Sequence, residues 1–186
     1  MGFSDVEHKF KKIGKDVVIG KFVYFRFPEL SEIGDNVIID EFCYFSTPVK
    51  IGNYIHIAPH SSVIGGQRSL FEMKDFSQMA AGCRIICGSD DFLGSGLIGP
   101  TIPFAYRAKV TTSTITLEEH AVLGAGCVVL PQVTIGEGSV VGALGLVKEN
   151  LPSWGVYVGT PVKRIKKRNF KKIAKMTAML KEEYGL

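Results

Sequence analysis

Residues 117–147 read LEEHAVLGAGCVVLPQVTIGEGSVVGALGLV, and an aliphatic residue recurs in this stretch at every sixth position. The recurring residues are Leu117, Leu123, Val129, Ile135, Val141 and Val147. An α-helix shows an apolar period near 3.6 residues and an ordinary strand a period of two, so neither accounts for a period of six. A short strand followed by a tight turn does account for it.

The same period runs through two earlier segments. One contains Ile33, Ile39, Phe45, Ile51, Ile57 and Val63, and the other contains Met73, Met79 and Ile85. The fifth position of each hexad is small or β-branched, and it is occupied by three of the four cysteines, Cys43, Cys83 and Cys127. Three hexads, about eighteen residues, complete one coil of a triangular parallel β-helix with both kinds of residue pointing inward. We therefore predict an all-β solenoid in which these cysteines are inert core residues.

Two insertions interrupt the period. The shorter, around GGQRSL, lies between Val63 and Met73, and the longer lies between Ile85 and Leu117. Both follow the third hexad of a coil, so they are predicted to leave the solenoid at one corner. Long loops on a solenoid usually carry function. The longer loop, residues 90–116, opens with two adjacent carboxylates, Asp90 and Asp91, and Arg68 lies in the shorter loop beside it.

The composition is that of one globular domain. The chain has 186 residues, of which 46% are apolar, so a real core is available. Its aliphatic stretches are shorter than the roughly 20 residues that span a bilayer, and the start, MGFSDVEHKF, lacks the apolar segment of a signal peptide. The cysteines show no zinc-ligand spacing. We expect a soluble cytoplasmic protein with no membrane insertion and no metal site.

The basic charge belongs to the C-terminal segment. Residues 162–186 carry nine Lys or Arg against two Glu, or +7, which leaves −3 for the rest of a chain whose total is +4. Apolar residues from Ile165 to Tyr184 give residues 163–184 a helical stripe, and we expect this helix to cap the open end of the solenoid. The segment has no nucleic-acid recognition motif, so we expect it to bind a smaller polyphosphate and not nucleic acid.

Over residues 13–168 the sequence resembles the hexapeptide-repeat acyltransferases. The resemblance rests on the repeats, on the close VGTPVKRIKKR, and on the loop GSDDFLGSGLIGPTIPFAYR, which looks like that of enzymes of bacterial surface-polysaccharide biosynthesis. It implies a left-handed β-helix that forms a homotrimer, with acyl-CoA between neighbouring subunits. The expected organisation is an N-terminal extension at residues 1–12, a β-helix at residues 13–160 with the loop insertion at residues 90–116, and a basic segment with a helix at residues 161–186.

The resemblance also implies where acetyl-CoA, the family's usual co-substrate, binds. Its pantetheine arm is expected to pass small residues that let the thioester approach the backbone closely, and these are Gly124, Ala125, Gly142 and Ala143. Its phosphates are expected to meet residues in and before the basic close, and these are Lys148, Pro161, Lys163 and Arg164. Flexible cations hold an exposed diphosphate without a deep pocket. Backbone N–H groups from Gly124 to Gly126 are candidate donors to the oxyanion of the reacting thioester.

The sequence departs from the family pattern at the catalytic base. Well-known sugar O-acetyltransferases of the family carry a histidine in the loop after the third hexad, and Asp90 stands at the matching place. A carboxylate with its ordinary pKa of about 4 is a weak base for a hydroxyl, although a like-charged neighbour raises the pKa of one of a pair. An amine acceptor needs less help, so an amino sugar is favoured, with Asp90 and Asp91 orienting the amine or accepting its proton. The alternative is that both aspartates cap the turn that opens the loop.

Two histidines are further catalytic candidates. His56 is predicted to point outward from a strand and His60 to lie at a turn, so that either reaches across the cleft between subunits to replace the missing base. We interpret His8 as a surface residue and His120 as an ordinary turn residue. A metal site like that of the γ-carbonic anhydrases, the other catalytic use of this fold, needs three convergent histidines, and the sequence offers no convincing third.

The leading hypothesis is an acetyl-CoA-dependent acetyltransferase acting on a sugar, with the amine of a nucleotide-linked amino sugar for surface glycans as the favoured acceptor. Two alternatives stay open, namely O-acetylation of a sugar or of a hydroxylated antibiotic, and a non-catalytic trimeric scaffold. The basic close and the long loop argue against the scaffold, because a spacer needs neither. The identity of the sugar is not fixed by the sequence, since the acceptor pocket is built from loops.

Overall fold

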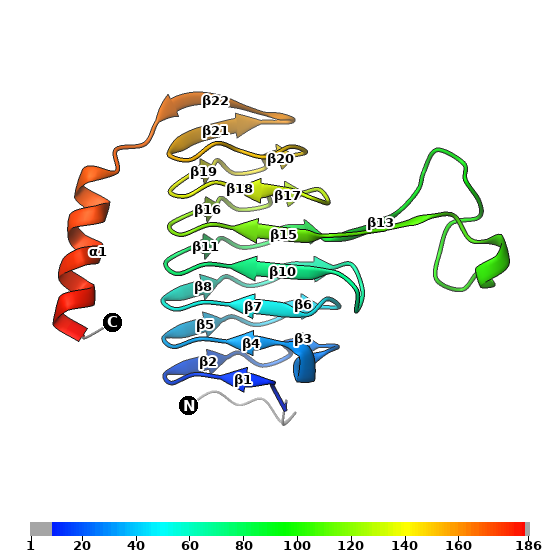
Figure 1. The fold of residues 1–186 in the computed structure, drawn as a ribbon, viewed down its shortest axis with the longest axis horizontal. Coiled ribbons are helices and arrows are strands. Elements are labelled where there is room, and N and C mark those ends of the chain that lie inside the picture. The colour runs from blue at the N-terminus through cyan, green and yellow to red at the C-terminus, as the bar shows by residue number, and fades with distance from the viewer. Residues whose placement is uncertain (1–8, 185–186) are drawn as a thin grey trace.

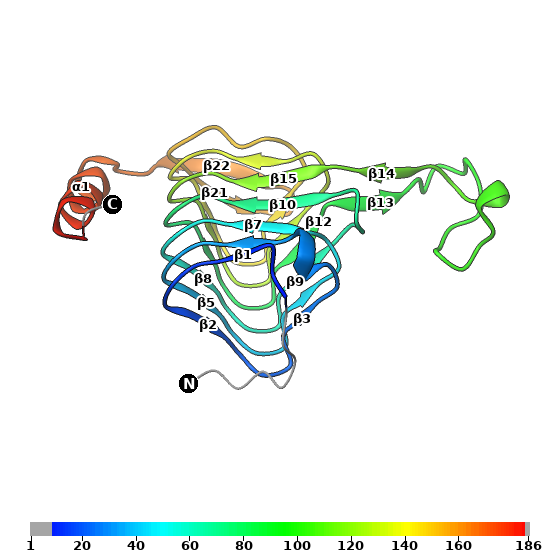
Figure 2. The same ribbon diagram turned by 60° about the horizontal axis from the view of Figure 1, so that its bottom comes forward.

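The computed structural model describes residues 9–184, which form a triangular parallel β-helix with a long arm on one side and a helix on the other (Figure 1, Figure 2). Three sheets make the faces of the prism, and successive strands belong to sheets A, B and C in turn. Each strand pairs with the strand one coil later, so that Val37, Ile38 and Ile39 lie beside Ile55, His56 and Ile57. The parallel β-helix predicted from the hexads is confirmed, and it matches the left-handed β-helix that the resemblance implies.

The strands are short, as a six-residue repeat requires. Sheet A contains β1 (Lys12–Ile13), β4 (Glu32–Ile33), β7 (Val49–Ile51), β10 (Leu70–Met73), β15 (Thr114–Leu117) and β18 (Thr134–Ile135). Sheet B contains β2 (Val17–Ile19), β5 (Val37–Ile39), β8 (Ile55–Ile57), β11 (Gln78–Met79), β16 (Val122–Leu123), β19 (Val140–Val141), β21 (Gly155–Gly159) and β22 (Val162–Lys167). Sheet C contains β3 (Tyr24–Phe25), β6 (Tyr44–Phe45), β9 (Ser62–Ile64), β12 (Arg84–Ile86), β17 (Val128–Val129) and β20 (Leu146–Val147).

The remaining elements lie outside these three sheets. A separate ribbon pairs β13 (Gly88–Asp90) with β14 (Val110–Thr112). Two 3-10 turns, η1 (Pro28–Leu30) and η2 (Phe104–Tyr106), lie in connecting segments. The single α-helix among the described residues is α1 (Lys171–Tyr184).

The core consists of the residues that recur in each hexad. All the aliphatic and aromatic residues of the period are at most 4% exposed, and the small residues at the fifth position are equally buried. The cysteines are buried and free, as predicted. Burial raises the pKa of Cys43 to about 11 and that of Cys87 to about 12, so these thiols stay protonated and unreactive at neutral pH.

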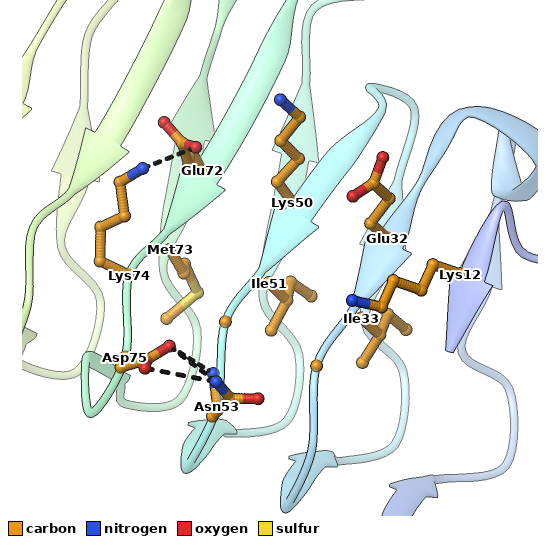
Figure 3. Close-up of a pocket in the computed structure, with 12 residues that line it drawn as sticks. Lys12, Glu32, Ile33, Lys50, Ile51, Asn53, Glu72, Met73, Lys74 and Asp75 are labelled. Carbon is orange, nitrogen blue, oxygen red and sulfur yellow. Dashed lines mark hydrogen bonds and ion pairs between the residues drawn. The ribbon is translucent and has the colours of Figure 1, made fainter. Parts of the chain in front are cut away.

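The corner between sheets A and B is held by polar side chains that link successive coils. The carboxamide oxygen of Asn53 accepts the N–H of Asp35 at 2.8 Å, and the Asp75 carboxylate accepts the N–H of Asn53 at 2.8 Å. Figure 3 shows Asp75 reaching Asn53 in the preceding coil. Each of these side chains therefore satisfies a backbone donor that the tight turn leaves without a partner.

The outer faces differ in composition. The side chains that point outward from sheet A alternate in charge from coil to coil, in the order Lys12, Glu32, Lys50 and Glu72 (Figure 3). The edge between sheets B and C is aromatic instead: Phe22 stacks on Phe42 with ring centroids 5.4 Å apart, and Tyr24 stacks on Tyr44 at 5.5 Å. All four rings are exposed. Sheet A therefore has the composition of a solvent face, whereas the B–C edge exposes rings whose burial is favourable.

The longer insertion forms an arm on the ribbon of β13 and β14, which leaves the prism at the corner between sheets C and A (Figure 2). The shorter insertion packs against its root, because a Cβ atom at Gly65 would lie 2.7 Å from the Gly88 nitrogen. Both insertions emerge at one corner, as predicted. The chain rejoins sheet A at Thr114, so the insertion ends before residue 116, where the sequence had placed its end.

The C-terminal segment corrects the prediction of one helix over residues 163–184. β22 pairs antiparallel with β21, and the helix begins only at Lys171. The turn Gly-Thr-Pro between the β-prone runs VYV and VKRIKK favours a hairpin, which satisfies backbone groups at the end of the stack. The hairpin, and not the helix, therefore covers this end of the solenoid (Figure 1).

Helix α1 lies along the corner between sheets A and B (Figure 1). The Thr177 hydroxyl is 3.2 Å from Nε2 of His120, and the Lys181 ammonium is 3.3 Å from the Glu119 carboxylate. The Arg168 guanidinium donates to the carbonyl of His120 at 2.9 Å just before the helix starts. These contacts attach the helix to the side of the prism, which corrects its predicted position at the open end.

Truncating a hexad side chain tests the inward assignment. Leu123→Ala should reduce the free energy of unfolding by about 2–5 kcal/mol, because Leu123 is 0% exposed and its loss leaves a cavity. Leu30→Ala removes the same atoms from a residue that is 40% exposed, and we expect a loss below about 1 kcal/mol. Denaturant unfolding at one fixed protein concentration compares the two. Equal losses would contradict the assignment of the hexad residue to the core.

Candidate active site

The corner between sheets B and C changes character along the solenoid. Its turn residue has a φ between 60° and 73° in every coil, and in chain order these residues are Phe22, Phe42, His60, Gly82, Gly126 and Leu144. Rings therefore occupy the first three coils, and glycines the next two. The residues before the last two turns, Ala125 and Ala143, are small and exposed. The main chain of the later coils is consequently open to solvent along this corner.

The three backbone donors predicted at this corner, from Gly124 to Gly126, are not equivalent in the structure. The N–H of Gly124 donates to the Val141 carbonyl at 2.8 Å, and the N–H of Gly126 donates to the Ala81 carbonyl at 2.9 Å. Both bonds join successive coils, so the N–H groups of Gly124 and Gly126 are not available to an oxyanion, which leaves Ala125 as the one candidate donor of the predicted range. Within residues 9–184, the N–H groups of Ala125 and Ala143 have no hydrogen-bond partner. The alanines, and not the glycines beside them, present donors to a ligand.

Gly124 and Gly142 are small because the next coil packs on them. A Cβ atom at Gly124 would lie 2.6 Å from the Ala143 nitrogen, and one at Gly142 would lie 2.9 Å from a methyl group of Val158. Neither distance leaves room for a side chain. The two glycines therefore support the corner from within, while the small size of the two alanines keeps its outer surface clear.

The hairpin of β21 and β22 places the basic close at one end of this corner. The Thr160 hydroxyl donates to the Leu144 carbonyl at 3.0 Å, which ties the hairpin turn, including Pro161, to the coil of Ala143. Lys163 and Arg164 follow in β22 with exposed side chains. Within the described residues neither side chain has a hydrogen bond or ion pair. Both cations are therefore free to meet an anion above the open corner.

One chain does not bring all the predicted site residues together. Lys148 follows β20 and Asp90 ends β13, so both lie at the C–A corner. Ala125 and Ala143 lie at the B–C corner, on the opposite edge of sheet C. Ala125 and Ala143 are thus separated from Asp90 and Lys148 within a single subunit by the width of one sheet.

Asp91 is engaged in the turn that opens the arm. Hydrogen bonds from the Ser95 hydroxyl and from the Leu93 N–H, the latter at 2.8 Å, hold the pKa of the Asp91 carboxyl below its ordinary value of 3.8. The N–H of Asp91 also donates to the Lys109 carbonyl at 2.8 Å across the ribbon. Asp91 therefore has the surroundings of a carboxylate that caps this turn, which is one of the two roles that the sequence left open.

Asp90 has different surroundings. It pairs with Val110 in the ribbon and is half-buried. Within residues 9–184 its carboxylate has neither a hydrogen bond nor an ion pair. A half-buried carboxylate without a partner attracts a cation, because burial makes an uncompensated charge costly. Of the two aspartates, Asp90 is the one free to meet a substrate group.

The two candidate histidines lie on the B side of the prism. His56 points outward from β8, and its Nε2 is 2.7 Å from Oδ2 of Asp40, so the carboxylate orients the imidazole. His60 occupies a turn, and its ring stacks on Phe42 with centroids 5.0 Å apart. Both positions agree with the sequence, and both lie away from the arm of the same chain. Asp40 was not singled out from the sequence.

The other ionisable groups add no metal centre. Burial lowers the pKa of His120, which is covered by α1. Among residues 9–184, no three side chains of His, Cys, Asp or Glu converge as they do around a bound metal ion. No helix in the same range is long and apolar enough to cross a bilayer.

Comparison with known proteins defines the class. The family model described as "Bacterial transferase hexapeptide (six repeats)" matches residues 31–65. The dTDP-4-amino-4,6-dideoxy-D-glucose acyltransferase of Escherichia coli is 33% identical over 133 residues, which are 72% of this chain and 67% of that protein. The chain therefore belongs to the hexapeptide-repeat acyltransferases, as its repeats and its close predicted.

Two further relatives are an N-acyltransferase and a putative O-acetyl transferase. The crystal structure of AntD, an N-acyltransferase from Bacillus cereus in complex with dTDP and 3-hydroxybutyryl-CoA, is 40% identical, covers 94% of this chain and 92% of that chain, and has a TM-score of 0.87. A variant of AntD was crystallised with dTDP-4-amino-4,6-dideoxyglucose and Coenzyme A. The putative lipopolysaccharide biosynthesis O-acetyl transferase WbbJ of Escherichia coli K12 is 33% identical over 67% of this chain and 60% of its own length.

The lowered pKa of Asp91 predicts how the arm responds to acid. Its hydrogen bonds favour the ionised carboxylate, so they are fully present above pH ~5 and are lost as the pH falls through the lowered pKa. The NMR shifts of the Leu93 and Ser95 amides should therefore stay constant from neutral pH down to about pH 5 and move together only in stronger acid. A common titration of these amides above that range would contradict the assignment.

Substitution separates the two aspartates. In Asp91→Ala the Leu93 amide should exchange with solvent faster at neutral pH, because its acceptor at 2.8 Å is gone. Asp90→Ala is the matched control, since the Asp90 carboxylate has no hydrogen bond or ion pair in the described part of the chain, and it should leave this exchange unchanged. Native-state hydrogen exchange measures both. Equal acceleration in the two variants would show that the ribbon, and not the Asp91 cap, protects the amide.

Proposed function

We propose that this protein transfers the acyl group of a CoA thioester to the amine of a dTDP-linked 4-amino-4,6-dideoxyhexose, and that it acts as a homotrimer. The observation that carries this proposal is the similarity to AntD along 94% of the chain, together with an arm that offers a free carboxylate and contains no histidine. Acetyl is the acyl group expected from the family. 3-Hydroxybutyryl is the other candidate, because AntD was crystallised with that CoA ester.

The B–C corner suits the acyl-CoA. Its exposed alanines offer the N–H groups of Ala125 and Ala143 to the amide carbonyls of the pantetheine arm. The hairpin turn at Pro161 lies at the end of the same corner, and the unpaired side chains of Lys163 and Arg164 would meet the phosphates there. Gly124 and Gly142 take part indirectly, because they let successive coils pack closely enough to align the donors.

The arm suits an amine acceptor. The carboxylate of Asp90 would bind the sugar ammonium, hold it near the thioester and accept the proton that must leave before nitrogen can attack. Asp91 would hold the first turn of the arm, and so the position of Asp90, through its bonds to Leu93 and Ser95. A hydroxyl acceptor would need a stronger base than an ordinary carboxylate, and the arm supplies none.

The site becomes complete only when subunits meet. The acyl-CoA residues and Asp90 lie on opposite edges of sheet C, so a three-fold arrangement that sets the C–A corner of one subunit against the B–C corner of the next unites them and also brings in Lys148. The arm supports such contact, because its apolar side chains are exposed on a projection that has no cover of its own. These side chains are Phe92, Leu93, Leu97, Ile98, Phe104 and Tyr106.

His56 and His60 are secondary candidates for the base. Each would reach the reacting groups only across the subunit cleft, since both lie away from the arm of their own chain. The Asp40 carboxylate holds His56, and stacking on Phe42 holds His60. We expect His60→Ala and His56→Ala to reduce kcat less than Asp90→Ala does, because Asp90 is the group placed to bind the amine.

Two other functions are outcomes of the same assays. Turnover with hydroxyl acceptors alone would replace the amine by O-acylation, which the similarity to WbbJ supports. A protein whose thermal stability does not change with millimolar CoA would instead fit the scaffold, because a ligand that binds the native state must stabilise it. Both proposed substrates are soluble nucleotide derivatives, so we place the reaction in the cytoplasm.

The amine assay tests the chemistry directly. The purified protein should acylate dTDP-4-amino-4,6-dideoxyglucose with acetyl-CoA or 3-hydroxybutyryl-CoA and release one CoA thiol per amide, followed with a thiol reagent and mass spectrometry. Asp90→Asn should lower kcat/KM for the sugar about 10–100-fold, which corresponds to one lost hydrogen bond to a charged group, with KM for acyl-CoA little changed. Asp91→Asn is the matched control and should have a smaller effect. An unchanged rate for Asp90→Asn would remove Asp90 from the mechanism.

Mixed oligomers test the shared site. Asp90→Ala removes the acceptor residue and Ala125→Trp obstructs the open corner, so each variant alone should have at most about a tenth of the unaltered activity. If Asp90 and Ala125 of one site come from two subunits, random mixing of the unfolded variants before refolding restores about a quarter of the sites. If both residues of a site come from one chain, no mixture regains activity. Refolded unaltered protein calibrates the yield.

A further inference from the structure

The open corner contains one more free donor than the family resemblance suggested. In the coil of β11 and β12, the N–H of Ala80 donates to the Leu123 carbonyl and the N–H of Gly82 donates to the Pro59 carbonyl, both at 2.9 Å. Between them, the N–H of Ala81 has no partner within residues 9–184, and Ala81 is exposed. Ala81 therefore repeats, one coil earlier, the arrangement of Ala125.

The column of free donors ends at Ala81. Pro59 occupies the equivalent place in the preceding coil, and proline has no N–H. The turn residue after it, His60, carries a ring that stacks on Phe42. The donors of the later coils thus form a row of three, in the order Ala143, Ala125 and Ala81. The hairpin cations lie at the Ala143 end of this row, and Pro59 lies beyond its Ala81 end.

Ala81 is also level with the acceptor residue. Ala81 follows β11, and Asp90 ends β13, which follows β12 of the same coil. Subunits related by rotation about an axis parallel to the solenoid stand at equal height. In the proposed trimer, Ala81 of one subunit therefore lies at the height of Asp90 of the partner subunit. Neither Ala125 nor Ala143 has this relation, because each belongs to a later coil.

We propose that the backbone N–H of Ala81 donates to the thioester carbonyl oxygen and stabilises the oxyanion formed from it, while Ala125 and Ala143 hold the pantetheine arm. This assignment rests on the proposed acyl transfer and names a catalytic group for it. A main-chain donor is fixed before the reaction begins, so it stabilises developing charge without reorganisation.

The reaction step balances with these groups alone. Asp90 first accepts one proton from the bound ammonium, and the neutral nitrogen attacks the thioester carbon. A C–N bond forms, and the π electron pair of the carbonyl moves onto oxygen, to which the Ala81 N–H donates a hydrogen bond. When this pair returns, the C–S bond breaks, CoA leaves as thiolate, and the proton lost by nitrogen converts it to the thiol. Asp90 then returns its proton to water.

Ala81→Pro removes this N–H with little other change. The pair Ala80-Ala81 becomes Ala-Pro, which already stands at Ala58-Pro59 in the equivalent turn, so the corner accepts the ring, and no internal hydrogen bond is lost. We expect kcat to fall about 10²–10³-fold, the usual loss for one oxyanion donor, with KM for acyl-CoA little changed. Ala125→Pro should mainly raise KM for acyl-CoA.

Two controls separate the donor from its surroundings. Ala81→Gly keeps the N–H and should keep kcat, and Glu41→Pro places proline at the equivalent position of an earlier coil and should leave both constants unchanged. If Ala81→Pro does not fold, lactic acid incorporated at position 81 replaces the N–H with an ester oxygen and keeps the methyl group; it should then show the same loss of kcat.

The outcomes distinguish this inference from the function on which it rests. A normal kcat in Ala81→Pro, or a loss of kcat in Ala125→Pro alone, overturns the assignment of Ala81. If the unaltered protein acylates only hydroxyl acceptors, the proposed amine substrate is wrong, and the same comparison with that acceptor still decides the donor. If the unaltered protein transfers no acyl group to any acceptor, both proposals fail.

Discussion

Hydrogen bonds between successive coils are the constraint on which the rest of the structure depends. Each coil must lie directly on the next, as when the N–H of Gly124 meets the carbonyl of Val141. This stacking requires small residues where one turn rests on another and a positive φ at the turn itself. In the three later coils it also uses the same backbone donors and leaves the same one unused, at Ala81, Ala125 and Ala143. The open row at the B–C corner is a consequence of how the solenoid is held together.

The sequence contains much of this fold, because the inward positions of the hexads from Ile33 to Val147 are all buried and only the two insertions interrupt their repeat. The phase of that repeat also predicts the corner from which the arm leaves. The hairpin at the end was missed, because Val162–Lys167 form a strand only through pairing with Gly155–Gly159, and the lysines there suit a helix equally well. Local pattern cannot decide a structure that a neighbouring segment stabilises.

The sequence predicts the candidate site less completely than it predicts the fold. The N–H groups of both glycines of LGAGCV are used within the stack, and the free donors belong to alanines, of which Ala125 and Ala143 were expected beside the ligand but Ala81 was not. The contact of Asp40 with His56 likewise joins residues in successive coils. The adjacent aspartates Asp90 and Asp91 read as a pair, but one is held by the turn and the other is free. These distinctions arise from three-dimensional neighbours.

Donors that lie on stacked strands are separated by a fixed spacing. Neighbouring strands lie about 4.8 Å apart, so a ligand that follows the corner past Ala143, Ala125 and Ala81 finds its next equivalent position one whole strand spacing away. Intermediate positions offer no aligned donor. The corner would therefore hold a linear ligand only at discrete positions, one strand spacing apart. The row of donors ends at Pro59, which has no N–H.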